Sequence, residues 1–300
     1  MKTLQLIIMD NRIIAVIPAF NEEKNIKRVV TGVIKYCQLV IIVNDNSTDA
    51  TKKIITEMKN IYNQKLEIIN NKKNMGIGSS MKKGLILALS KESDIIIKID
   101  GDGQHRPEDI PEFISKIEDE NFDLVKGNRF YNIDSVTSMP KIKILGNLLI
   151  TNIQKIISGN YSISDPNNGF LAFKTEKIRL INIKHLHNKY FFENSLSIIF
   201  TAFNFKIGEI GIETIYRDEK SSIPVFVAGL KLIPTFIIFL IRKNLITASR
   251  SLSINSLIFF ICIFLTVLNL IINTSVLWTI IFCLIPLYIF VDILNHYQFR

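Results

Sequence analysis

Apolar residues are unevenly distributed along this chain of 300 residues. Residues 1 to about 222 mix apolar and charged positions, whereas charges become rare from Ile223 onward and long apolar runs appear. This change predicts a domain of soluble character followed by a segment that associates with a membrane. We expect a domain over residues 1–222, amphipathic helices at the membrane interface over 223–250, and a two-helix transmembrane hairpin over 251–300.

Strand and helix patterns alternate within the first part. Short apolar runs predict strands, and the segments between them place apolar residues at the three- and four-residue spacing of a helix. The strand runs are continuous, which is typical of strands buried on both faces, so the pattern predicts an α/β fold with a mainly parallel, doubly wound sheet. Asn21 is expected to cap the first helix, with Glu22 in its first turn. The expected strands are 13–18, 39–43, 66–70, 94–99 and 122–127.

Polar segments follow these strands, at the carboxyl ends where such sheets bind ligands. Asp45 follows the second strand, and Asp100 and Asp102 follow the fourth. A lone Asp-x-Asp pair is as consistent with turn capping as with metal binding. The three carboxylates should nevertheless converge on one crevice, with Gln104 adding an oxygen ligand. Mg²⁺ or Mn²⁺ holding a diphosphate would relieve their repulsion, so we predict a metal and diphosphate site here.

The net charge and the cysteine content limit the classes of partner and the cellular setting that the sequence predicts. The net charge of +9 is compatible with nucleic acid, anionic lipid or phosphorylated substrates. The sequence has no helix-turn-helix or RNA-binding signature, so we expect no nucleic-acid partner. The three cysteines lack metal-ligand spacing, and their odd number argues against a disulfide framework. A reducing, cytoplasmic setting is therefore expected for the first part.

Six segments also resemble, in order, the motifs of family 2 glycosyltransferases with the GT-A fold. The resemblance covers about residues 12 to 222, and within the family it is similar to the dolichol-phosphate mannose synthase and polyprenyl-phosphate glycosyltransferase branch. It implies a Rossmann-like GT-A domain and a metal-dependent glycosyltransferase. The segments are IPAFNEEKNI, VNDNSTDAT, NMGIGSSMKKGL, KIDGDGQHRPEDIP, GNRF and DPNNGFLAFK.

The resemblance also implies roles for individual residues at the strand ends. The residues implied to bind the nucleotide are Pro18, Phe20, Glu22, Asp45 and Asp100. The residues implied to hold the metal and the donor diphosphate are Asp100, Asp102 and Gln104. In the second motif the family's usual paired acids are Asn44 and Asp45 here, so only one carboxylate remains.

On the acceptor side, the resemblance makes Arg129 a ligand of the acceptor phosphate, and Asp165 with the turn Asn167–Phe170 would shape the sugar and acceptor site. The residues implied to be catalytic are therefore Asp100, Asp102, Arg129 and Asp165. The residues implied to bind the acceptor phosphate are Arg129, Lys143, Asn147, Arg217 and Lys220. Lys143 stands where the family has an arginine, so it offers a point charge instead of a planar fork. Glu193 could lie near the reaction centre or cap the core.

The C-terminal part contains two apolar stretches, Ile254 to Ile272 and Ser275 to Ile293, that are long enough to span a bilayer. Basic residues lie outside this pair, and the connection between them has none, so the positive-inside rule places both ends and the enzyme domain in the cytoplasm. These residues are Arg242, Lys243, Arg250 and Arg300.

The preceding segment, 223–244, has two readings. It could be a third span, but Lys231 and Pro234 lie at its centre. These residues favour an amphipathic helix or helix pair on the membrane surface.

The expected function is transfer of a sugar, with inversion, from a nucleotide sugar to a polyprenyl phosphate (dolichyl or undecaprenyl) at the cytoplasmic face of the cell membrane. Such a phosphate is largely ionised near neutral pH and needs no strong general base. GDP-mannose, UDP-glucose and UDP-N-acetylglucosamine all remain open as donors, and a homo-oligomer is compatible with the sequence.

Other functions also remain open. A family 2 enzyme that extends a lipid-linked glycan or surface polysaccharide would attack through a sugar hydroxyl and need a base, with Asp165 or Glu193 as candidates. A non-catalytic relative would keep the fold to bind lipid or a partner, although the intact Asp100-Gly101-Asp102 and Arg129 argue against it. A nucleotidyltransferase is disfavoured because no glycine-rich, arginine-containing loop follows the first strand.

Overall fold

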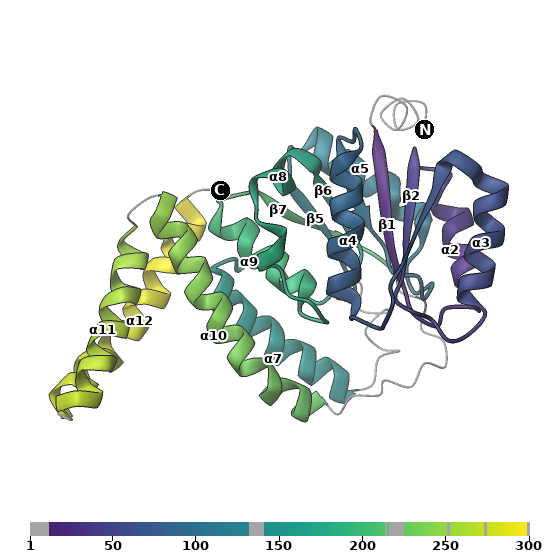
Figure 1. The fold of residues 1–300 in the computed structure, drawn as a ribbon. Coiled ribbons are helices and arrows are strands. Elements are labelled where there is room, and N and C mark those ends of the chain that lie inside the picture. Colours follow the sequence, from purple (N-terminus) through teal and green to yellow (C-terminus); the bar gives the residue numbers. More distant parts are fainter. Residues whose placement is uncertain are drawn as a thin grey trace.

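A computed structural model describes residues 12–131, 141–213, 215, 225–250, 253–272 and 275–298. In this part of the chain a seven-stranded sheet has the order β3-β2-β1-β4-β6-β5-β7 and carries helices on both faces (Figure 1). The five predicted strands are confirmed, and two further strands follow them. The strands are β1 Ile13–Ala19, β2 Leu39–Asn44, β3 Leu66–Asn70, β4 Ile95–Lys98, β5 Leu124–Asn128, β6 Leu171–Lys174 and β7 Ile207–Gly211.

Helices connect most of these strands. The α-helices are α2 Ile26–Val33, α3 Thr51–Tyr62, α4 Ile77–Ser90, α5 Ile110–Asp119, α7 Lys141–Ser158, α8 Thr175–Leu180, α9 Phe192–Ala202, α10 Val225–Arg250, α11 Ile254–Ile272 and α12 Ser275–Gln298. Short 3-10 turns occupy Asn63–Lys65, Pro107–Asp109 and Ile183–His185.

The sheet is mostly parallel, as the continuous apolar runs predict. Strands β1 to β4 run parallel to their neighbours among themselves, and β5 runs parallel to β7. Strand β6 is antiparallel to both β4 and β5, and it places Leu171 opposite Lys98 on one side and Lys126 on the other. The reversal therefore brings two strand lysines next to the turn that precedes β6.

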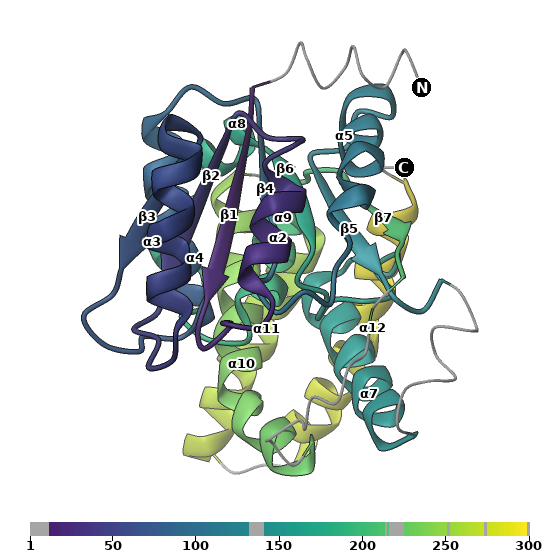
Figure 2. The same ribbon diagram turned by 90° about the vertical axis from the view of Figure 1, so that its right-hand side faces the viewer.

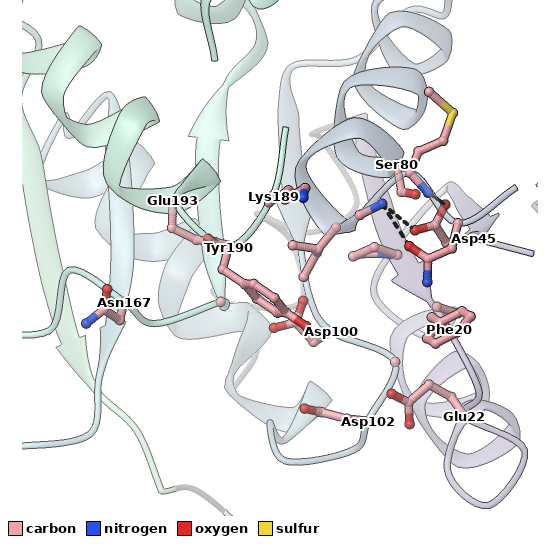
Figure 3. A pocket seen from close by; sticks show the side chains of 18 residues that line it. Phe20, Glu22, Asp45, Ser80, Asp100, Asp102, Asn167, Lys189, Tyr190 and Glu193 are labelled. Atoms are coloured by element: carbon pink, nitrogen blue, oxygen red, sulfur yellow. Dashed lines mark hydrogen bonds between the residues drawn. The ribbon is translucent and has the colours of Figure 1, made fainter. Parts of the chain in front are cut away.

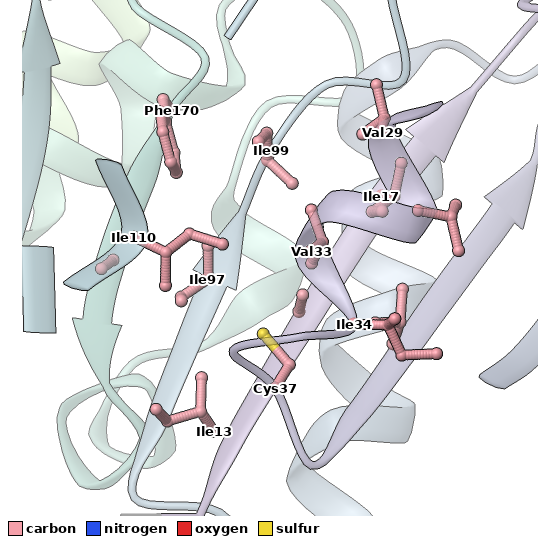
Figure 4. Close-up of a cluster of buried hydrophobic side chains, with 14 of the residues drawn as sticks. Ile13, Ile17, Val29, Val33, Ile34, Cys37, Ile97, Ile99, Ile110 and Phe170 are labelled. Atoms are coloured by element: carbon pink, nitrogen blue, oxygen red, sulfur yellow. The ribbon is translucent and has the colours of Figure 1, made fainter. Parts of the chain in front are cut away.

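Two apolar cores enclose the sheet. Alternate residues of β1, such as Ile13 and Ile17, face α2, α3 and α5, where they pack with Val29 and Val33 (Figure 4). The intervening residues face α4 and α9. This two-sided burial explains why β1 begins with an unbroken apolar run, since residues 13 to 17 contact the two cores in alternation.

The predicted cap of the first helix is wrong. Helix α2 begins at Ile26, after Asn25, and Asn21 has a left-handed backbone with φ of 59°. The Asn21 side-chain oxygen accepts a hydrogen bond of 2.8 Å from the Thr48 amide and so ties two loops together. Asparagine tolerates this backbone conformation better than most residues. Glu22 consequently lies in a turn before the helix.

Helix α10 is one continuous helix with Pro234 inside it, so the predicted helix pair is not observed. It lies beside α7 and packs on α9 (Figures 1 and 2). Phe236 and Phe239 are buried in the core on the α4 side of the sheet, whereas Ile237 and Ile241 are exposed. The helix therefore has one face on the domain and an apolar face that is uncovered.

The two C-terminal helices, α11 and α12, pack against each other. Among the described residues, one helix is long and apolar enough to cross a membrane, over Leu277–Leu294 of α12, judged by length and composition. The first predicted span, Ile254 to Ile272, corresponds to α11, whose apolar part, Ile254–Asn269, is shorter. A pair of spans is therefore not confirmed.

Close packing of α4 on the sheet yields a stability prediction. A side chain at Gly84 would place its Cβ 2.3 Å from Val16 Cγ1. In an open helix Gly→Ala stabilises by about 1 kcal/mol, but overpacking costs about 1–3 kcal/mol. We expect Gly84→Ala to lower the free energy of unfolding, measured by denaturation followed by circular dichroism. Ile86→Ala, at an exposed position of the same helix, should change it little, and a more stable Gly84→Ala variant would contradict this packing.

Candidate active site

A cavity of about 580 Å³ opens at the carboxyl edge of the sheet, beyond β1, β2 and β4 (Figure 3). The parallel direction of these strands brings their polar ends to the same edge, as the sequence predicts. The residues named in the sequence analysis that line the cavity include Pro18, Phe20, Glu22, Asp45, Asp100, Asp102, Asn167, Gly169 and Glu193. Lining residues that the sequence analysis did not single out include Asn74, Met75, Ser80, Lys189 and Tyr190.

Asp45 organises one end of the cavity. Its buried carboxylate accepts hydrogen bonds from the Met75 amide at 2.9 Å and the Gly76 amide at 2.8 Å, and a third from Asn71 Nδ2 at 2.7 Å. Gly76 immediately precedes α4 and has a φ of 88°, a conformation that favours glycine. A carboxylate at the start of a helix is stabilised by the helix dipole. Asp45 therefore fixes the loop that closes this end.

Asp100 and Asp102 lie at the centre of the lining. One Asp100 oxygen accepts a hydrogen bond of 2.6 Å from Lys98 Nζ, and an Asp102 oxygen accepts one of 2.9 Å from the Gln104 amide. Gln104 itself does not line the cavity in the described part of the chain. Its backbone supports Asp102, and its predicted role as a metal ligand remains a prediction.

Lys98 is a buried cation that the sequence analysis missed. Its side chain is 0% exposed, and its amine contacts Asp100, Glu193 Oε1 at 2.8 Å and the Gly169 carbonyl at 2.9 Å. Burial alone would lower the pKa of Lys98, but the charges of Asp100 and Glu193 outweigh it and hold that pKa above its ordinary value. A lysine inside an apolar strand run was the available signal, because a buried lysine needs an acidic partner.

Glu193 is brought to the cavity by this ion pair. It lies in the first turn of α9, lines the cavity and is 5% exposed. The close approach depends on Gly169, where a Cβ would lie 2.0 Å from Asp100 Oδ2. The turn before β6, the end of β4 and the start of α9 thus meet at one buried amine.

Arg129 and Asp165 form a second ion pair behind the cavity. Arg129 Nε and Nη2 donate to the two Asp165 oxygens at 2.7 and 2.8 Å, which is a bidentate arrangement. Burial raises the pKa of the Asp165 carboxyl, but hydrogen bonds and the charge of Arg129 reverse this and hold the pKa below its ordinary value. The structure therefore joins two residues to which the resemblance gives separate roles, and neither lines the cavity itself.

Four predicted acceptor residues have no described side chain. Lys143 and Asn147 belong to α7, but the structure does not describe their side chains. Arg217 and Lys220 lie outside the described residues. Their predicted role remains a prediction.

The fold and the cavity define an α/β domain with an acidic cavity at the carboxyl edge of its sheet, and comparison with known proteins gives the family. A model of glycosyl transferase family 2 matches residues 14–181, so the chain belongs to this family of glycosyltransferases.

Similar relatives include lipid-phosphate sugar transferases. A UDP-N-acetylglucosamine–dolichyl-phosphate N-acetylglucosaminyltransferase of Methanococcus voltae is 33% identical over 221 residues, which cover 70% of this chain and 88% of the relative. A polyprenol monophosphomannose synthase of Mycolicibacterium smegmatis is 22% identical over 213 residues, which cover 67% of this chain and 80% of the relative.

Solved structures share the fold. Glucosyl-3-phosphoglycerate synthase of Mycobacterium tuberculosis, in complex with Mn²⁺, UDP-glucose and phosphoglyceric acid, has a TM-score of 0.57 at 18% identity, covering 81% of this chain and 82% of that one. This likeness confirms the GT-A type of α/β fold.

The buried ion pair yields a prediction on stability. Lys98→Met leaves two carboxylates without their buried counter-charge, so we expect a loss of about 3–5 kcal/mol in the free energy of unfolding. Adding Glu193→Gln should recover part of this loss, because one of the two carboxylates becomes neutral. Denaturation of both single variants and the double variant measures the coupling, and strictly additive effects would contradict a direct interaction. Lys65→Met, at an exposed position, is the matched control.

The second buried lysine yields a pH prediction. Burial lowers the pKa of Lys126 to about 8, against partly compensating charges of Glu193 and Asp165. The unfolded chain binds this proton up to its higher ordinary pKa, so the wild type gains stability as pH rises from 8 towards 10. Relative to Lys126→Met, the gain between these values should be about 2 kcal/mol. Equal pH profiles for the two proteins, obtained by denaturation in detergent, would show that Lys126 is not perturbed.

Proposed function

We propose that this protein transfers a sugar, with inversion, from a nucleotide sugar to a polyprenyl phosphate at the cytoplasmic surface of a membrane. The names of the similar relatives support the lipid-phosphate acceptor. The observation that carries the choice is that Asp165 and Glu193, the two candidate bases for a hydroxyl acceptor, are both held in ion pairs. An ionised phosphate needs no such base, whereas a sugar hydroxyl does.

The donor would lie along the cavity with its base towards Asp45 and its diphosphate towards Asp100 and Asp102. Phe20 supports this orientation because it lies near Asp45 in the cavity (Figure 3), and Pro18 and Glu22 belong to the same lining. Phe20 is 42% exposed, and such an uncovered ring is suited to contact a nucleobase.

A divalent ion, Mg²⁺ or Mn²⁺, fits the residues present. Asp100 and Asp102 supply carboxylate oxygens to the cavity, and the described residues contain no cluster of three or more His, Cys, Asp or Glu ligands. The remaining ligands would come from the donor phosphates, which is the usual arrangement for Mg²⁺. When bound, the ion would offset charge on the leaving diphosphate. Lys98, which donates to Asp100, would hold that carboxylate in position for this contact.

The acceptor phosphate would approach from the side of Arg129, with Lys143, Asn147, Arg217 and Lys220 as further ligands. Arg129 is already oriented by Asp165, and an arginine with a fixed guanidinium plane is well suited to phosphate.

The lipid tail of the acceptor would stay in the bilayer. The uncovered apolar face of α10 supports a surface-lying helix over 223–250, and the apolar stretch of α12 supports a transmembrane hairpin over 251–300. Membrane attachment would hold the cavity close to the lipid phosphates.

A donor panel tests this function. Full-length protein in liposomes with Mn²⁺ and a short polyprenyl phosphate is offered labelled GDP-mannose, UDP-glucose or UDP-N-acetylglucosamine, and label is counted in the organic phase. We expect one donor to label the lipid, EDTA to abolish this, and Asp102→Asn to reduce it at least about a hundredfold. Glu57→Gln, an exposed acid on α3, is the matched control. Transfer to a glycan would support polysaccharide extension instead, and no turnover of any donor by folded protein would contradict both.

A further inference from the structure

We propose that Lys189 is the side chain that binds the diphosphate of the donor, an assignment that rests on the proposed function. Lys189 belongs to the loop between the 3-10 turn Ile183–His185 and α9, a segment outside the six motifs. It lines the same cavity as Asp45 and Asp100 (Figure 3).

The charges around the cavity favour a basic side chain as a ligand of the diphosphate. Five carboxylates line it in the described part of the chain, and Lys189 is the one basic residue among the described lining residues. The carboxylates are Glu22, Asp45, Asp100, Asp102 and Glu193. Lys98 lies beneath the lining and is already engaged by Asp100 and Glu193. A cation of the protein beside the metal would further reduce the repulsion between these carboxylates and an entering diphosphate.

The position of Lys189 fits the middle of the donor. A Cβ at Gly76 would lie 3.2 Å from Lys189 Cγ, so the aliphatic part of Lys189 crosses the start of α4, next to the amides that bind Asp45. In Figure 3, Lys189 lies between Glu193 on one side and Asp45 on the other. A nucleotide with its base near Asp45 and its diphosphate near Asp100 would pass beside this amine.

The loop that carries Lys189 is held in place by backbone contacts. The Asn188 carbonyl accepts a hydrogen bond of 2.8 Å from the Ser79 amide, and Gly78 permits this approach because a Cβ there would lie 2.2 Å from the His187 carbonyl oxygen. By contrast, no hydrogen bond or ion pair joins the Lys189 amine to another residue that the structure describes. A fixed backbone with an uncommitted amine at a cavity is the arrangement expected of a ligand-binding lysine.

Nucleotide binding tests this assignment separately from catalysis. Full-length wild type, Lys189→Met and Lys189→Arg are titrated in detergent, by calorimetry, with UDP, GDP, uridine and guanosine, with and without Mn²⁺. Lys184→Met is the matched control, an exposed lysine of the preceding 3-10 turn that does not line the cavity. We expect Lys189→Met to bind the preferred nucleoside diphosphate about tenfold more weakly while its affinity for the nucleoside is unchanged. Lys189→Arg should retain most of the affinity.

Three outcomes would overturn the assignment in distinguishable ways. If Lys189→Met binds the diphosphate as tightly as Lys184→Met and wild type do, Lys189 does not contact the diphosphate, and the proposed function stands. If Lys189→Met loses nucleoside and diphosphate affinity equally, its role is to shape the cavity. If the folded wild type binds neither nucleotide under any condition, the proposed function itself is wrong.

Discussion

The site depends on one buried amine. Lys98 is fully buried and joins a carboxylate at the end of β4, a carboxylate at the start of α9 and a carbonyl in the turn before β6. Without Lys98, Asp100 and Glu193 would lose their shared buried counter-charge. Removing one partner of a buried ion pair strongly lowers the free energy of unfolding. The lysine therefore fixes the geometry of the central carboxylates before any ligand arrives. It is also the point at which three segments distant in the sequence become one site.

The reversed strand β6 makes this convergence possible. Because β6 lies between β4 and β5 and runs antiparallel to both, Leu171 is flanked by Lys98 and Lys126. The turn that begins at Asn167 is consequently delivered to the carboxyl edge of the sheet, where Asn194 of α9 donates to it. If β6 ran parallel to β4 and β5, its last residue, and not its first, would lie at the carboxyl edge of the sheet. Because β6 is antiparallel, the polar residues that precede it lie at the cavity.

Much of this was predictable from the sequence, and the limits have physical causes. The five continuous apolar runs identify their strands, and strand-end polarity identifies Asp45, Asp100 and Asp102, because parallel topology alone brings them together. Strands β6 and β7 were not predicted because neither forms a long apolar run: β6 has only four residues, and β7 contains two glycines and a glutamate. Lys98 stands out in the sequence as a lysine within an apolar strand. Its partner Glu193 lies 95 positions away, however, and only the fold brings the two together. Asp292 in the second apolar stretch was missed for the same reason, since it binds Lys243 of α10 at 2.8 Å and Asn255 of α11 at 2.7 Å.

Contacts of α10 also tie the apolar C-terminal helices to one wall of the cavity. Arg242 of α10 donates to the His185 carbonyl at 2.5 Å, and the ring of Phe236 packs at 5.0 Å against that of Phe191. The segment between His185 and Phe191 carries Lys189, and its opposite side is bound to the start of α4. The segment 185–191, which forms one wall of the cavity, therefore contacts the sheet domain on one side and α10 on the other. Any displacement of α10 must either break these contacts or move that wall, so the orientation of the apolar helices and the shape of the donor cavity are mechanically linked.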